Sequence, residues 1–411
     1  MRRGSRLAGT ATVVALLVLC APAARAQEGL VVLTRANVLD VRSGQVTAAA
    51  SVVIDDGRIR SIERAAFTPP AAATVIDVDG RFVLPGLMDA HTHISSLAAA
   101  RRALESGVTT VRSVSVGGYR DVALRELVRQ GRLAGPDMLA AGVFVTPELG
   151  ESALADPRLA PLFGETIDTP EELAALVEVN LAHGVDWVKT RGTERAGLPN
   201  TDPRKQTYTE AQLRAVVEAA DGVPVAAHAH GDEGAAAAVR AGVRSIEHGT
   251  YLSDATLRLM KERGTYLVPT YTTVVDLTQP GGDYDNPILF VRGLHMLPRL
   301  ADTVRRAHAL EVPIVTGADT GYGAESVTRV AHEVAAFVEL GMTPLEAIQA
   351  ATTTAAALLG IDDRTGRVEA GLEADLIVVE RNPLEDVIAL QDVLVVISNG
   401  QVALNRLPFA R

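Results

Sequence analysis

The stretch FVLPGLMDAHTH, residues 82–93, joins an apolar run to a cluster of polar side chains. Its first half, Phe82–Leu87, has the length and apolar character of a buried β-strand. His91 and His93 follow two residues apart, so on an extended chain both imidazoles point to the same side. Two neutral imidazoles with one direction make half of a divalent metal site. Taken alone, the pair is equally consistent with a metal site and with two core or surface histidines that bind no metal.

Seven more apolar runs of strand length follow, and helical patterns separate most of them. The runs cover residues 109–114, 138–145, 185–189, 224–229, 244–247, 266–270 and 312–316. Helical patterns cover residues 170–183, 210–220, 232–241, 254–263 and 300–310, and a helical tail follows at 325–340 and 344–359. Eight strands that alternate with helices predict an α/β protein with a (β/α)8 TIM barrel of parallel strands over residues 86–365.

Both ends of the chain read differently, as short strands without helices between them. The strands are expected at residues 30–33, 51–54, 58–62, 74–78, 374–379 and 393–397. Asp56-Gly57 and Asn399-Gly400 are tight-turn signals between such strands. Pairing the two ends would satisfy their open strand edges. We therefore expect residues 27–85 and 366–411 to form one small β-domain.

The N-terminus reads as a cleavable signal peptide. Arg2, Arg3 and Arg6 precede an apolar run over residues 11–19, and Ala24-Arg25-Ala26 is a small-x-small cleavage site. The apolar run is too short for a permanent membrane anchor. Removal of residues 1–26 takes away four arginines and the single cysteine, which leaves a mature chain with a net charge of −15. We expect a periplasmic or secreted protein without a stable membrane anchor.

Composition excludes several classes of protein. The 411 residues carry a net charge of −11, with 47% hydrophobic and 22% charged residues, which is ordinary for a globular chain. An acidic chain is a poor partner for nucleic acid, because phosphate binding needs a positive field. One cysteine excludes a disulfide framework and a cysteine-based zinc site.

Titratable side chains gather where the predicted strands end. Lys189 ends the fourth strand, His228 the fifth, His248 the sixth, and Asp319 follows the eighth. Active sites of such barrels lie at the carboxyl ends of the strands. Asp319 alone would suit a helix N-cap. Beside converging histidines, its carboxylate is better suited to a metal ligand and general base.

Lys189 is the most informative single residue. A lysine that ends a buried apolar strand costs several kcal/mol unless its charge is paired or removed. One answer is a salt bridge to a carboxylate. The other is carboxylation by carbon dioxide, which gives an anionic carbamate able to bridge two cations and therefore suits a two-metal site.

These residues together resemble the amidohydrolase superfamily, the metal-dependent hydrolases on a distorted (β/α)8 barrel. Residues 83–93 carry one signature and residues 371–379, which lead into a β-sandwich, carry another. Residues 107–112, 225–231 and 246–249 are similar to the imidazolonepropionase-like and prolidase-like branch, although Ser113 stands where many relatives have an aspartate. That branch includes dipeptidases for a C-terminal proline or basic residue and an ochratoxin amidase.

The resemblance implies two divalent metal ions, with zinc preferred, and a set of ligands. It assigns one ion to His91, His93 and Asp319, the other to His228 and His248, and a bridging N6-carboxylysine to Lys189. His230 lies two residues after His228 and faces the same side, so it could polarise the scissile carbonyl or hold a substrate carboxylate. Arg191 and Tyr271 are further candidates for substrate contacts. His183, His295, His308 and His332 receive no role.

The function expected is hydrolysis of a small amide, in a dipeptide or N-acyl amino acid, by a metal-bridging hydroxide. Asp319 would accept the hydroxide proton and pass it to the leaving nitrogen. The alternative is a hydrolase of cyclic amides, lactones or phosphotriesters on the same metal core, because fold does not decide the bond. A non-catalytic exported binding protein is a third reading, which the complete ligand set disfavours. The oligomeric state, including a homo-oligomer, is left open.

Overall fold

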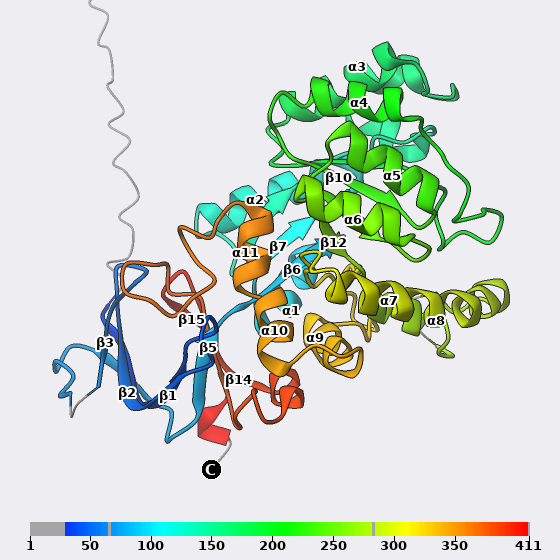
Figure 1. Ribbon diagram of the computed structural model, residues 1–411. Coiled ribbons are helices and arrows are strands. Elements are labelled where there is room, and N and C mark those ends of the chain that lie inside the picture. Colours follow the sequence, from blue (N-terminus) through cyan, green and yellow to red (C-terminus); the bar gives the residue numbers. More distant parts are fainter. Residues whose placement is uncertain (1–28, 65–66, 282–283, 410–411) are drawn as a thin grey trace, which may run out of the picture.

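The computed structural model describes residues 29–64, 67–281 and 284–409. This part of the chain forms one mixed β-sheet and two parallel β-sheets, with most of the helices packed around the parallel strands (Figure 1). The expected signal peptide, residues 1–26, lies outside the described residues. Among the helices of the described ranges, none combines the length and the apolar character that crossing a bilayer requires.

The mixed sheet contains strands from both ends of the chain. Its order is β15-β14-β13-β5-β1-β2-β3, and β4 also pairs with β1. The strands are β1 (Val31–Leu39), β2 (Val46–Asp55), β3 (Arg58–Glu63), β4 (Thr74–Asp77), β5 (Phe82–Pro85), β13 (Leu376–Val379), β14 (Val393–Ser398) and β15 (Gln401–Asn405). The two ends meet where β13 pairs with β5, and Figure 1 shows the blue and red strands together. The ends therefore share one sheet, and a sandwich of two sheets stays a prediction.

The predicted strand Phe82–Leu87 is in fact two strands in different sheets. β5 ends at Pro85 in the mixed sheet, and β6 begins at Leu87 in a parallel sheet. Gly86 lies between them, and a Cβ atom there would be 2.1 Å from Oγ1 of Thr109. Only glycine lets the chain pass this close to its neighbour. The single-strand prediction was wrong because an uninterrupted apolar run does not reveal a change of sheet.

The two parallel sheets carry the strands of the predicted barrel. One has the order β6-β7-β8 and the other β12-β11-β10-β9. Their bounds are β6 (Leu87–Thr92), β7 (Val108–Ser113), β8 (Asp137–Ala140), β9 (Val188–Arg191), β10 (Val225–Ala229), β11 (Ser245–His248) and β12 (Tyr266–Val268). The helices are α1 (Leu97–Glu105), α2 (Arg120–Arg129), α3 (Pro170–Ala182), α4 (Glu210–Ala219), α5 (Asp232–Ala241), α6 (Asp254–Arg263), α7 (Tyr271–Asp276), α8 (Pro287–Ala309), α9 (Val330–Glu339), α10 (Pro344–Ala350) and α11 (Thr353–Leu359).

The expected eighth strand, residues 312–316, lies outside the regular strands of the described chain. Its backbone still bonds to both sheets. The amide of Val315 donates to the carbonyl of Leu267 in β12 at 2.9 Å, and the amide of Ala90 in β6 donates to the carbonyl of Thr316 at 3.0 Å. At the opposite edges of the two sheets, Val145, which follows β8, donates its amide to the carbonyl of Lys189 in β9 at 2.8 Å. These bonds place the two parallel sheets edge to edge.

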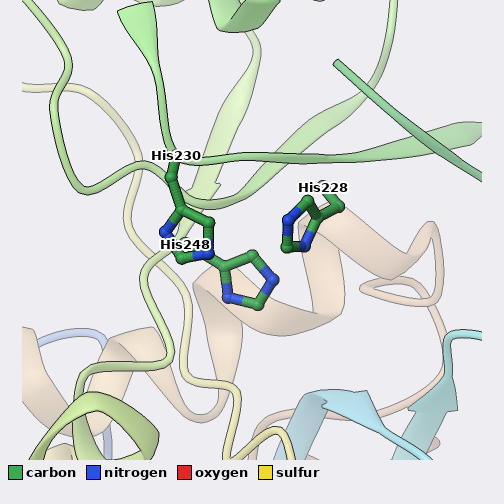
Figure 2. A group of neighbouring side chains, drawn as sticks. All are labelled: His228, His230 and His248. Carbon is green, nitrogen blue, oxygen red and sulfur yellow. The ribbon is translucent and has the colours of Figure 1, made fainter. Parts of the chain in front are cut away.

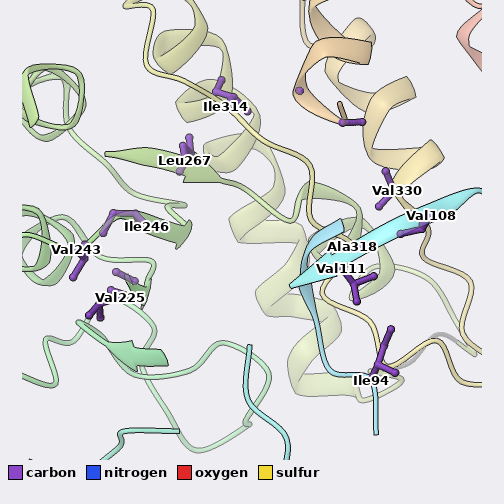
Figure 3. Packing of buried hydrophobic residues seen from close by; sticks show 14 of the residues in the cluster. Ile94, Val108, Val111, Val225, Val243, Ile246, Leu267, Ile314, Ala318 and Val330 are labelled. Atoms are coloured by element: carbon purple, nitrogen blue, oxygen red, sulfur yellow. The ribbon is translucent and has the colours of Figure 1, made fainter. Parts of the chain in front are cut away.

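Apolar side chains fill both sides of the parallel strands. The larger cluster includes Val225, Ile246 and Leu267 (Figure 3). A smaller buried cluster contains Trp187 and Ala226, which precede Lys189 and His228 by two residues. Because side chains two apart on a strand share a side, this cluster lies beneath the polar groups at the strand ends. Packed apolar side chains therefore lie directly beneath the site.

A buried carboxyl group lies where β13 begins. Asp375 accepts hydrogen bonds from the amide of Asn399 at 2.9 Å and from the hydroxyl of Thr365 at 2.8 Å. Burial, followed by the nearby carboxylate of Asp137, raises the pKa of Asp375 to about 7. The folded protein therefore keeps a proton here that the unfolded chain releases near pH 4.

Replacing Asp375 by asparagine is expected to make the free energy of unfolding less sensitive to a rise in pH from 5 to 8. In the wild type, ionisation of the buried carboxyl lowers the free energy of unfolding as pH rises from 5 to 8, because the folded state binds the extra proton. The difference in unfolding free energy, variant minus wild type, should rise over this range by roughly 2 kcal/mol. Urea denaturation at both pH values measures it. The exposed Asp363→Asn is the control, and equal pH slopes for Asp375→Asn and wild type would contradict the assignment.

Candidate metal centre

The strand ends surround one cavity of about 200 Å³. His91 belongs to β6, Lys189 to β9 and His248 to β11, and each side chain reaches the cavity from the carboxyl end of its strand. The cavity is also lined by His93, His228, His230 and Asp319. All the metal ligands expected from the sequence therefore meet in one place, as parallel strands dictate.

The first group consists of His91, His93 and Asp319. Oδ1 of Asp319 lies 3.5 Å from Nε2 of His91 and 3.1 Å from Nε2 of His93. The amide of Asp319 donates to the carbonyl of His91 at 2.8 Å, which fixes the two residues side by side. One ligand atom of each residue lies within 4.8 Å of the others. Two imidazoles and a carboxylate in this arrangement can hold a divalent metal ion.

The second group consists of His228, His230 and His248 (Figure 2). The ring centre of His248 lies 4.5 Å from that of His228 and 4.7 Å from that of His230, on which it stacks. All three rings are buried. His230 thus offers a nitrogen to the same group as the two histidines that were expected to bind metal. The group presents imidazole nitrogens alone, a donor set typical of zinc and similar ions.

Backbone and side-chain partners fix which nitrogen of the histidines faces the cavity. Nδ1 of His91 donates to a carboxylate oxygen of Glu247 at 2.6 Å, and Nδ1 of His93 donates to the carbonyl of Ser115 at 2.8 Å. Nε2 of His228 donates to the carbonyl of Glu194 at 3.1 Å. The opposite nitrogen of each ring is therefore left as a lone-pair ligand.

The other two histidines are held by threonine hydroxyl groups. Nδ1 of His230 lies 2.8 Å from Oγ1 of Thr250, and Nδ1 of His248 lies 2.7 Å from Oγ1 of Thr270. His248, Thr270 and Asp319 also have positive φ angles of 74°, 48° and 44°. This left-handed backbone conformation is energetically unfavourable for non-glycine residues, and such strain is common at functional sites.

Burial keeps four of the imidazoles neutral. It lowers the pKa of His91 to about 4 and that of His230 to about 3, and it places the pKa of His228 and His248 well below the ordinary value. Burial opposes ionisation of Asp319, but the nearby His91 and His93 hold the pKa of its carboxyl below the usual value. At neutral pH the site thus offers these four neutral imidazoles and a carboxylate, the forms that bind metal.

The amine of Lys189 is buried in this site without a hydrogen-bond partner among the described residues. The side chain is 3% exposed. Burial lowers the pKa of the amine to about 8. An unpaired buried ammonium is costly, whereas a bridging carbamate would have two cations as partners. The orphaned amine and the two histidine groups fit a centre that binds two divalent metal ions.

One supporting group was not predicted from the sequence. Glu247 is fully buried, and besides His91 it accepts a hydrogen bond from the guanidinium of Arg112 at 2.8 Å. Although burial would raise it, the charge of Arg112 holds the pKa of Glu247 well below its usual range. The strand pattern places Glu247 beside the expected ligand His248, but nothing in the sequence links it to Arg112 or His91.

Two of the expected substrate contacts lie outside the cavity wall. Among the described residues that line the cavity, neither Arg191 nor Tyr271 is present, whereas Arg195 and Tyr284 are. The amide of Tyr271 donates to buried Glu333 at 2.7 Å, which fixes the start of α7. His230, the third expected substrate contact, lines the cavity. The roles of all three residues toward substrate stay predictions.

Comparison with known proteins identifies the class to which this fold and site belong. The amidohydrolase family model matches residues 82–403, and the chain belongs to that family. Ochratoxinase of Aspergillus niger is 28% identical, over 90% of this chain and 85% of the relative. Imidazolonepropionase of Symbiobacterium thermophilum is 26% identical, over 84% and 83%. The crystal structure of a Xaa-Pro dipeptidase with bound methionine in the active site has a TM-score of 0.82 and 31% identity, over 91% and 99%. The branch expected from the sequence is confirmed.

Proposed function

We propose that this chain is a binuclear metal-dependent amidohydrolase that cleaves a small amide, in a dipeptide or an N-acyl amino acid. The observation that carries the proposal is the orphaned amine of Lys189, which shares a cavity with two groups of potential ligands. Ochratoxinase and the Xaa-Pro dipeptidase support an amide or peptide bond as the target.

The residues that would hold the metal ions come from the two groups, with His230 of the second group left for contact with the substrate. His91, His93 and Asp319 would bind one ion, His228 and His248 the other, and Lys189 as N6-carboxylysine would contact both. Nitrogen and oxygen donors of this kind suit Zn²⁺. Bound divalent ions would supply Lewis acidity that activates water and polarises a carbonyl group.

The chain itself supplies proton transfer and orientation. Asp319 is ionised at neutral pH, so its carboxylate can accept a proton from attacking water and deliver it to the leaving nitrogen. With Nδ1 of His230 accepting from the hydroxyl of Thr250, Nε2 keeps its hydrogen and can donate to the carbonyl oxygen of the substrate. The cavity volume of about 200 Å³ favours small substrates.

We infer two further properties that frame this activity. The backbone bonds between the parallel sheets and residues 312–320 support a closed, distorted (β/α)8 barrel. The basic start, short apolar run and small-residue cleavage site of residues 1–26 support export to the periplasm or the medium. An exported enzyme without cysteine would form no disulfide bonds in an oxidising environment.

Hydrolysis assays on purified residues 27–411 test the proposed function. The panel contains dipeptides, N-acetyl amino acids, lactones and phosphotriesters, each with metal-loaded and chelator-treated protein. We expect release of free amino acids, a loss of at least about 100-fold on chelation, and recovery with Zn²⁺. The control is His308→Ala, because His308 lies on α8 beside Glu346 and should leave metal content unchanged. Activity confined to lactones or phosphotriesters, or insensitive to chelation, would contradict the proposal.

A further inference from the structure

The cavity has an unbalanced set of charges. Among the described residues that line it, Asp319 is the only acid, and that carboxylate is already placed between His91 and His93. The same residues include one lysine, Lys189, which the proposed function converts to an anionic carbamate, and one arginine, Arg195. The protein as a whole is strongly acidic, with a net charge of −11. An anionic group of the substrate that does not contact the metal ions therefore needs another positive group in this cavity.

Arg195 has a free guanidinium. Its side chain is exposed and makes no hydrogen bond or ion pair within the described part of the chain. The adjacent Glu194 does not neutralise it, because the carboxylate of Glu194 pairs with Lys205 at 2.7 Å and accepts from the amide of Asp202 at 2.9 Å. Arg195 is near enough to the metal site for its charge to act on Lys189 and His228.

The loop that carries Arg195 is held firmly against the site. The carbonyl of Glu194, one residue earlier, accepts from the ring of His228 at 3.1 Å. The guanidinium of Arg292 in α8 donates to the carbonyls of Ala196, Leu198, Pro199 and Thr201. The ring of Tyr284 packs on Gly197, where a Cβ atom would lie 3.1 Å from it. The loop backbone thus fixes the base of Arg195 relative to the histidines.

Arg191 is less suited to the same task. Its side chain is partly buried, Nε has no hydrogen-bond partner among the described residues, and it is absent from the described cavity lining. Lys189, the other lysine or arginine among the described lining residues, is assigned to the metal ions by the proposed function. Arg195 is left as the cation that a substrate can reach.

From this arrangement we propose that Arg195 binds the free carboxylate of the substrate and makes the enzyme selective for amides of a terminal amino acid. This inference rests on the proposed function and adds its substrate class. A guanidinium can take a carboxylate through two parallel hydrogen bonds, which a neutral carboxamide cannot match in charge. In the dipeptides and N-acyl amino acids of the proposed function, the residue released would carry this carboxylate.

Paired substrates test the proposal. The probes are Ala-Pro, Ala-Phe and N-acetyl-L-methionine, together with the primary C-terminal amide of each. Wild-type kcat/KM should be roughly 100-fold higher for each acid than for its amide. Arg195→Gln should lower kcat/KM for the acids by roughly 10- to 100-fold, mainly through KM, and change that for the amides less than about 3-fold. Arg195→Lys should retain part of the preference, and Arg195→Glu should reverse it.

Two controls keep the result specific. Arg204→Gln removes a cation from the same loop, one that already pairs with Asp202 at 2.9 Å, and should leave the acid-to-amide ratio unchanged. Arg191→Gln should also leave the ratio unchanged. If Arg191→Gln abolishes the preference, or if Arg195→Gln lowers acids and amides equally, the proposal is wrong.

Binding measurements separate failure of this inference from failure of the proposed function. If no amide in the panel is cleaved, the proposed function fails. Calorimetric titration of metal-loaded protein with N-acetyl-L-methionine and with its amide still measures the role of Arg195. The acid should bind at least about 10-fold more tightly than the amide in wild type, and equally in Arg195→Gln. Equal binding of both probes to wild type would overturn the inference.

Discussion

Replacing Lys189 by methionine is expected to stabilise the metal-free protein and, at the same time, to abolish its activity. The wild-type amine is buried without a partner among the described residues, and burial lowers its pKa to about 8. At pH 7 the folded protein therefore carries an ammonium that would be better solvated in the unfolded chain. Methionine has a similar length and no charge, so it removes this cost, which is on the order of 3 kcal/mol.

The pH dependence gives the sign of this effect. The pKa of Lys189 is lower in the folded state than in the unfolded chain, so between about pH 8 and pH 10 the unfolded state binds more protons. The free energy of unfolding of wild type should therefore rise with pH in this window. The advantage of the methionine variant should be largest at or below pH 7 and should shrink toward pH 10.

Three measurements on one pair of proteins check this prediction. Urea denaturation of metal-free protein at pH 7 and pH 10 gives the stability difference. Metal analysis and turnover should show that Lys189→Met holds fewer than two ions and loses activity by at least about 1000-fold. A ¹³C carbamate signal should appear in metal-loaded wild type supplied with labelled bicarbonate and be absent from the variant. Lys261→Met, which removes an exposed lysine paired with Glu311, is the matched control.

The outcomes separate two roles of Lys189, a metal-binding carbamate and a salt bridge that stabilises the fold. Near-normal turnover with two bound ions in the methionine variant would reject the carbamate. A methionine variant that is less stable than wild type at both pH values would show that the lysine stabilises the fold, as a salt bridge would. The structure favours the carbamate over a salt bridge, because no carboxylate contacts Nζ among the described residues.

The convergence of the expected metal ligands was predictable because their positions follow from backbone periodicity. His91 and His93 are two residues apart, and Lys189, His228 and His248 each end a recognisable apolar run. In parallel strands, the carboxyl ends meet by construction, so the sequence pattern alone predicts that these side chains converge. All of them line one cavity.

Groups that depend on loops or on distant pairings were not predictable in the same way. Arg195 and Tyr284 come from irregular segments whose path is set by contacts such as that of Arg292 with four carbonyls. Arg191, which was expected at the substrate, ends a strand but turns out to be absent from the described cavity lining. Strand periodicity gives the side to which a residue points, while a loop residue has no such constraint.

The second large effect is expected from replacing Glu247 by glutamine. The carboxylate of Glu247 joins the buried guanidinium of Arg112 to Nδ1 of His91, and Ser245 also donates to it at 2.5 Å. Glutamine has the same shape but no charge. The variant leaves the cation of Arg112 without its partner in the protein interior, which should lower the free energy of unfolding by about 3–5 kcal/mol.

The same substitution should weaken metal binding through His91. A carboxylate can only accept the hydrogen on Nδ1, so it fixes the tautomer that presents Nε2 to the cavity. The amide of glutamine can present a donor instead, which permits the other tautomer. Loss of such a partner usually weakens metal binding by about 10- to 100-fold. Metal titration and urea denaturation measure the two effects separately, and Glu380→Gln, which breaks the exposed pair with Arg81, serves as the control for both.

A double variant distinguishes the two roles of this carboxylate. Arg112→Met combined with Glu247→Leu removes both charges together, and apolar replacements of a buried ion pair are often neutral or stabilising. Its stability should return to within about 1 kcal/mol of wild type, while metal binding stays weak because Nδ1 of His91 still lacks its acceptor. If the double variant recovers both properties, Glu247 serves only to neutralise Arg112. If it recovers stability alone, the carboxylate orients a metal ligand, and the ion pair with Arg112 is what allows that carboxylate to remain charged in the interior.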